Sequence, residues 1–117
     1  QDVAISLDIA ASEFGARGRY RLGLESRELD ADALSDMLIG WLDRYPIASI
    51  EDPLAEDDAD GLARFTQAVG HRVQIIGDDF LVTSAARVRV AAAQGACNAV
   101  LVKPNQAGTV TETRAAL

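Results

Sequence analysis

The chain has 117 residues, of which 49% are hydrophobic and 25% are charged, as in an ordinary globular domain. Eighteen acidic residues against eleven basic ones give a formal net charge of −7, so we expect no nucleic-acid partner, whose phosphates need a basic surface. No apolar run is long enough to span a membrane, and the single cysteine, Cys97, has no partner for an intrachain disulfide. These features favour a reducing, cytoplasmic location without membrane contact.

The first part of the chain predicts a strand, a polar connection and a helix. The stretch "VAISLD" (3–8) is short, β-branched and apolar, which is typical of a parallel strand covered on both faces. Residues 12–30 are polar and rich in Gly and Arg, and predict a long loop or a short hairpin. A helix capped by Asp30 or Asp32 and ended by Pro46 is predicted from an apolar stripe formed by Leu34, Met37, Leu38, Trp41, Leu42 and Tyr45.

The rest of the chain alternates strands and helices. Three further strands are predicted at "IASIED" (47–52), "VQIIGD" (73–78) and "AVLVK" (99–103). The helices between and after them are predicted at 59–69 with Gly70 as C-cap, at 84–94 with Thr83 or Ser84 as N-cap and Gly95 as terminator, and from Val110 onward.

This alternation predicts a right-handed, parallel α/β architecture. A complete (β/α)₈ barrel has eight strands and about 250 residues. Four predicted strands in 117 residues correspond to half of such a barrel. We therefore expect about four parallel βα units that form part of a larger barrel.

Four polar residues share one position in this pattern. Asp8, Glu51, Asp78 and Lys103 each lie at or near the carboxyl end of a predicted strand, just before a connection. In a barrel the carboxyl ends of the strands surround the active site, so these four side chains are expected to converge.

The chemistry of this set indicates a metal site. Three converging carboxylates repel one another and raise one another's pKa values. A divalent cation resolves that repulsion, and a hard cation such as Mg²⁺ prefers oxygen ligands. Beside such a cation the pKa of Lys103 is expected to fall, which would let its amine act as a base near neutral pH.

Each residue also has a purely structural interpretation. "EDP" (51–53) and "GDD" (77–79) are common turn signals, Asp8 could cap a turn, and lysine commonly extends into solvent. The coincidence of four polar strand ends favours the functional interpretation. The acidic stretch "AEDDAD" (55–60) is interpreted as a solvated loop before a helix, and His71 receives no catalytic role.

Four stretches of the sequence resemble enolases, in the family's order and spacing: "LDIAASEF" (7–14), "YPIASIEDPLAEDD" (45–58), "QIIGDDFLVT" (74–83) and "LVKPNQAGTVTET" (101–113). The resemblance implies an enolase-type (β/α)₈ barrel in which Asp8, Glu51 and Asp78 bind Mg²⁺ and Lys103 is the catalytic base. A lysine base working with Mg²⁺ is the known chemistry of the enolase superfamily. The implied reaction is the glycolytic dehydration of a phosphorylated small molecule, 2-phosphoglycerate, to phosphoenolpyruvate.

The resemblance also implies what the chain does not carry. Residues 1–117 correspond to the third to sixth strands of the C-terminal catalytic barrel domain, without the N-terminal lid domain, the catalytic acid or the phosphate-binding residues. We therefore expect the isolated chain to be inactive, and, because a half-barrel has open strand edges, to form homo-oligomers. Gly15, Ser84 and Pro104 depart from residues frequent in the family and indicate a divergent member.

Two other interpretations remain open at this stage. One is a different lyase of the superfamily, similar to methylaspartate ammonia-lyase, which also pairs three carboxylates with a lysine. The other is a non-catalytic half-barrel module that completes a ring by pairing with another chain.

Overall fold

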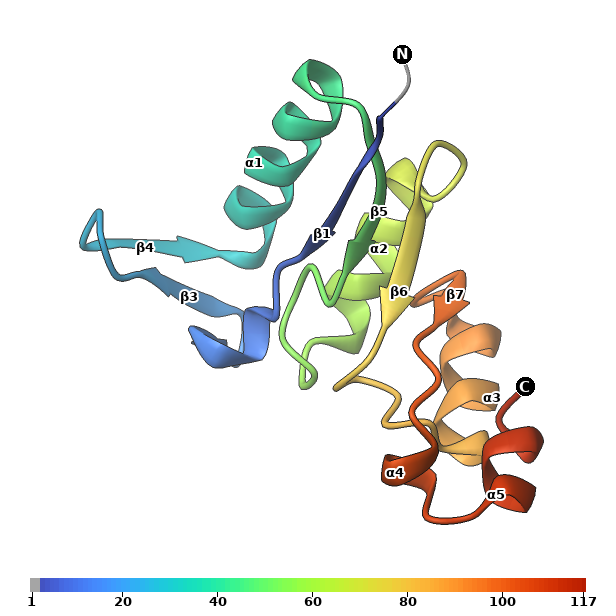
Figure 1. Cartoon of the computed structure of the whole chain (residues 1–117). Coiled ribbons are helices and arrows are strands. Elements are labelled where there is room, and N and C mark those ends of the chain that lie inside the picture. The colour runs from blue at the N-terminus through green and yellow to red at the C-terminus, as the bar shows by residue number, and fades with distance from the viewer. Residues whose placement is uncertain (1–2) are drawn as a thin grey trace.

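The computed structural model describes residues 3–117 and contains two sheets, shown with the helices in Figure 1. The first part of the chain contains β1 (Ile5–Asp8), the 3-10 helix η1 (Ala11–Glu13), β2 (Gly15–Ala16), β3 (Arg19–Leu22), β4 (Arg27–Asp30) and α1 (Ala31–Arg44). The second part contains β5 (Ile47–Glu51), α2 (Ala59–Val69), β6 (Gln74–Gly77), α3 (Ala85–Gln94), β7 (Ala99–Val100), α4 (Pro104–Ala107) and α5 (Val110–Ala115).

The larger sheet has the strand order β1-β5-β6-β7, and all three pairings are parallel. Each strand therefore lies beside the next one of this sheet along the chain, which is the arrangement of consecutive βα units in a barrel. The four strands expected from the sequence are confirmed, although each is shorter than its apolar stretch. The predicted strand over 99–103 shortens most, because β7 pairs only through Ala99 and Val100.

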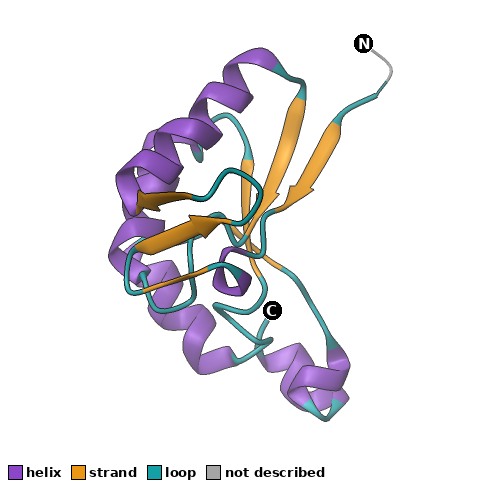
Figure 2. Ribbon diagram, turned by 90° about the vertical axis from the view of Figure 1, so that its left-hand side faces the viewer, coloured by secondary structure: helices purple, strands orange, loops and turns teal. Residues whose placement is uncertain are grey.

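Helices cover only one face of this sheet. In Figure 2 the main helices lie on one side of the strands, and the opposite face carries no helical layer. Ile5 of β1 is accordingly 37% exposed. The expectation of strands covered on both faces is therefore wrong for this chain. In a complete barrel such a face is covered by side chains of the opposing strands.

The core lies between the sheet and the helices. Leu34 and Leu38 of α1 and Phe65 of α2 pack with Ile50 of β5 and Ile75 of β6, and all five are at most 1% exposed. Burial of apolar surface of this kind supplies the main favourable free energy of folding. No helix within residues 3–117 is long and apolar enough to cross a membrane.

Capping residues fix the ends of the helices. Asp30, one of the two predicted caps, accepts a hydrogen bond of 2.8 Å from Ala33 N at the start of α1. Ser84 caps α3 in the same way, and Gly95 ends it with a left-handed φ of 66°, which glycine adopts without strain. Gly70 ends α2 as predicted but stays right-handed, with φ −63°.

The polar segment 12–30 is more regular than the sequence indicated. It forms a three-stranded antiparallel sheet, β2-β3-β4, that projects to one side of the molecule (Figure 1). Tyr20 of β3 is fully buried, and its ring lies over Gly15, where a Cβ atom would collide with it. The glycine that departs from the family pattern thus makes room for this ring.

The C-terminal part contains one helix that the sequence did not predict. Pro104 occupies the first turn of α4, where its missing N–H costs no hydrogen bond. Lys103 is the N-cap residue of this short helix. The next helix, α5, begins at Val110 as predicted, with Thr109 as its N-cap.

Candidate active site

The four predicted site residues lie at one end of the parallel sheet. Asp8 is the last residue of β1 and Glu51 the last of β5, and the two are direct partners in the strand register. Asp78 follows β6 immediately, and Lys103 lies between β7 and α4. Because all four strands run in one direction, their carboxyl ends meet at the same edge.

The pKa of Glu51 is shifted upward in this environment. Its pKa is raised to about 7, first by burial and then by the negative charges of Asp8 and Asp78, with a side-chain hydrogen bond to Asp78 adding to the effect. The sequence-based expectation that three carboxylates perturb one another's protonation is thus met at Glu51.

Lys103 pairs directly with Asp78. The Lys103 ammonium contacts Asp78 Oδ2, and the Asp78 side chain is only 9% exposed. The hydrogen bond to Asp78 raises the pKa of Lys103 above its ordinary value. The lowered pKa expected from the sequence depends on a neighbouring cation and stays a prediction.

The donor set fits a hard cation in its chemistry. Asp8, Glu51 and Asp78 offer carboxylate oxygens, the ligands that Mg²⁺ prefers. Among residues 3–117, no three His, Cys, Asp or Glu side chains are arranged to hold a metal ion together. Both carboxylate oxygens of Asp78 have protein partners, Lys103 and Gln106.

Gln106 and Thr83 join the site and were not identified from the sequence. Gln106 Nε2 donates to Asp78 Oδ1 at 3.2 Å, so the carboxylate is held from both sides. The Thr83 hydroxyl donates to Gln106 Oε1 at 3.0 Å and accepts from Lys103 N at 2.9 Å. One buried hydroxyl thereby fixes the backbone of Lys103 and the side chain of Gln106.

The backbone before α3 is strained where Thr83 makes these contacts. Val82 has φ 44° and Thr83 has φ 51°, both in the left-handed region that β-branched residues rarely adopt. Such conformations persist only where surrounding interactions enforce them, and they cluster at functional sites. Thr83 is 2% exposed and hydrogen-bonded, which meets that condition.

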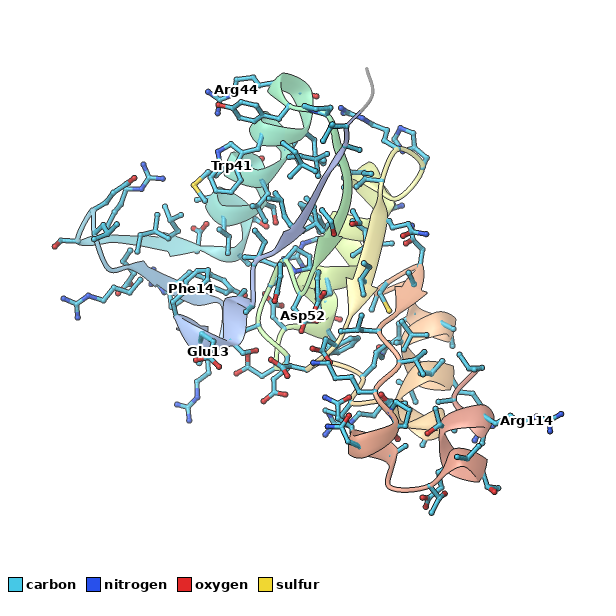
Figure 3. All side chains as sticks on the ribbon, in the orientation of Figure 1. Glu13, Phe14, Trp41, Arg44, Asp52 and Arg114 are labelled. Atoms are coloured by element: carbon cyan, nitrogen blue, oxygen red, sulfur yellow. The ribbon has the colours of Figure 1, made fainter. Side chains whose placement is uncertain are left out.

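Asp52 is a further acidic residue, which the sequence analysis interpreted only as part of a turn. It follows Glu51, is 4% exposed and accepts hydrogen bonds from Asp78 N and Asp79 N. Its pKa is raised, chiefly by burial, while these two backbone donors act in the opposite direction. Figure 3 labels Asp52 in the middle of the molecule, at the end of β5.

A family model described as "Enolase, C-terminal TIM barrel domain" matches residues 1–117. The chain belongs to the enolase family. Its topology agrees, because the parallel β1-β5-β6-β7 sheet with its helices is a part of an α/β barrel. The resemblance found in the sequence motifs is thereby confirmed.

Individual enolases match almost the whole chain. The chain is 44% identical over 115 residues to "Enolase 2" of Pseudomonas syringae pv. syringae, a match that covers 98% of this chain and 27% of that protein. It is 47% identical over 114 residues to "Enolase 1" of Methylococcus capsulatus, covering 97% of this chain and 27% of that protein. The chain thus spans about a quarter of the length of these relatives, 27% in both cases.

Proposed function

We propose that this chain is part of a longer, Mg²⁺-dependent enolase, which dehydrates 2-phosphoglycerate to phosphoenolpyruvate in the glycolysis of the cytoplasm. The observation that supports the proposal is the position of Asp8, Glu51, Asp78 and Lys103 at the carboxyl ends of the four parallel strands, with Lys103 paired to Asp78, in a chain of the enolase family. Residues 1–117 would form the third to sixth strands of its catalytic barrel domain.

In this proposal Lys103 is the base. Its amine would remove the proton from the carbon next to the substrate carboxylate, and Thr83 would keep its backbone in place through the bond to Lys103 N. Asp8, Glu51 and Asp78 would hold Mg²⁺. When bound, the cation would supply positive charge to the doubly charged enolate that proton loss creates.

Other groups of the reaction would come from the remainder of the protein. The proposal assigns no catalytic acid and no phosphate-binding residue to this chain. We therefore propose that the isolated chain does not turn over substrate.

The test uses the full-length protein with Mg²⁺ and 2-phosphoglycerate, and follows phosphoenolpyruvate by its absorbance. Lys103 is the only lysine among the 117 residues, so Lys103→Ala removes a unique amine. We expect turnover in the wild type and a loss of roughly 10²–10⁴-fold in this variant, the typical effect of removing a proton-transfer group. Arg89→Ala removes an exposed cation on α3 and is the matched control, with unchanged turnover.

Two results would count against the proposal. Turnover that survives Lys103→Ala would remove Lys103 as the base. Absent turnover of 2-phosphoglycerate, with ammonia released from methylaspartate instead, would favour the other lyase of the superfamily. A panel of phosphorylated and amino-acid substrates therefore separates the two enzymes, and inactivity of the full-length protein on all of them would favour a non-catalytic half-barrel module.

A further inference from the structure

We infer that Asp52 is a positioning residue that sets the direction of the Asp78 carboxylate. The inference rests on the proposed role of Asp78 as a Mg²⁺ ligand. It concerns Glu51 and Asp52, two consecutive acidic residues at the end of β5 whose side chains face different groups.

Asp52 holds the chain at the start of the β6–α3 connection with both of its carboxylate oxygens. Its Oδ1 accepts from Asp78 N at 3.0 Å, and its Oδ2 accepts from Asp79 N at 2.8 Å. Its own backbone N donates to Ile76 O at 2.9 Å. Three hydrogen bonds thus join one residue after β5 to three residues at the end of β6.

These bonds fix the peptide group from which the Asp78 side chain projects. Hydrogen bonds from backbone N–H groups to a carboxylate are shorter and stronger than those between neutral groups. Two of them on consecutive N–H groups leave the segment little freedom to rotate or translate. The Asp78 carboxylate is then placed by its own side-chain torsions alone, between Lys103 and Gln106.

The same contacts separate Asp52 from the carboxylates that face the site. Both of its oxygens already accept backbone hydrogen bonds, and its side chain is buried. The left-handed φ of 40° at Asp52 turns the chain immediately after Glu51. As a result Glu51 faces Asp8 and Asp78, whereas Asp52 faces the backbone of the next strand end.

The experiment measures Mg²⁺ affinity of the full-length protein by calorimetry without substrate, together with its melting temperature. Asp52→Asn keeps the size of the side chain and suits the left-handed backbone, but it places an NH₂ group against a backbone N–H. We expect the Mg²⁺ dissociation constant to rise roughly 10–100-fold, as for other groups that orient a metal ligand. Asp52→Gly, which also tolerates this backbone, is a second variant in case the first does not fold.

Asp58→Asn is the matched control. Asp58 lies on the same β5–α2 connection and accepts a backbone hydrogen bond of 2.9 Å from Gly61 N, but it caps α2 and holds no proposed ligand. Because asparagine caps a helix about as well as aspartate, we expect this variant to keep a melting temperature close to that of the wild type and an Mg²⁺ dissociation constant within twofold of it.

Asp78→Asn separates failure of this inference from failure of the proposed function. If Asp78→Asn weakens Mg²⁺ binding and the folded Asp52 variants do not, Asp52 only stabilises the connection and the inference is overturned. If Asp78→Asn leaves Mg²⁺ binding unchanged, Asp78 is not a ligand, and the proposed metal site falls together with the inference.

Discussion

The Tyr20 hydroxyl accepts a hydrogen bond of 3.0 Å from the backbone N of Ala55, and both residues are buried. This bond ties the small antiparallel sheet to the β5–α2 connection. Two neighbouring contacts join the same segments: Ser12 Oγ accepts from Glu56 N, and Asp57 Oδ2 accepts from Arg17 N, each at 2.9 Å. The connection that follows Glu51 is thereby held by residues 12–20, which lie between β1 and β4 along the chain.

Tyr20→Phe should destabilise the protein. The substitution keeps the buried ring but leaves the Ala55 N–H without its partner, which costs about 1–3 kcal/mol of the free energy of unfolding. Thermal and denaturant unfolding of the full-length protein would measure the loss. Tyr45→Phe, which removes a hydroxyl from a residue that is 53% exposed, should have no comparable effect.

Stability should also fall at alkaline pH because of Tyr20. Burial raises the pKa of this phenol above its ordinary value of about 10, and the charges of Asp58 and Asp57 add to the shift. The unfolded chain then loses the proton at a lower pH than the folded chain, so the free energy of unfolding falls as the pH rises past about 10. Stability measured as a function of pH should lose this decrease in Tyr20→Phe and keep it in Tyr45→Phe.

Thr83→Val should impair both stability and turnover, whereas Thr83→Ser should not. Valine has nearly the shape of threonine but leaves the Lys103 N–H and Gln106 Oε1 without the hydroxyl, at a cost of about 1–3 kcal/mol. Serine keeps the hydroxyl and suits the left-handed backbone better than a β-branched residue. Equal turnover in the two variants would show that the hydroxyl does not position Lys103.

The isolated chain of 117 residues should associate with itself. Within residues 3–117, β1 and β7 are edge strands of the parallel sheet; Ile5 of β1 and Val102, which follows β7, are each 37% exposed. Unpaired edges and an uncovered apolar face favour pairing with another chain. Sedimentation equilibrium at several concentrations measures the mass, and a compact monomer at all of them would contradict this expectation.

The sequence predicts the framework of this fold because that framework depends on local patterns. The strand β5 follows from one short apolar stretch. The caps Asp30 and Ser84 each bond a backbone N–H only three residues further along the chain. The positions of Asp8 and Glu51 could also be predicted, because adjacent parallel strands bring their carboxyl ends to the same end of the sheet.

The groups that support the site could not be predicted in this way. Asp52 and Thr83 act on backbone atoms of segments 26 and 20 residues away, and no spacing in the sequence identifies such partners. Gln106 lies in the family-like stretch "KPNQAG" and carries a signal only through that likeness. The left-handed backbone at Val82 and Thr83 runs against the preference of both residue types, so local propensity predicts the wrong conformation there.

The register of β1 against β5 places two acidic residues side by side at one end of the pairing. Because Asp8 and Glu51 are partners, these two strands can pair only by bringing two acids side by side. Like charges in such positions oppose strand association, so the pairing must be driven by the neighbours before them: Leu7 opposite Ile50, and the hydroxyl contact between Ser6 and Ser49. We therefore expect acid or dissolved divalent cations, which reduce this repulsion, to strengthen the pairing of β1 with β5.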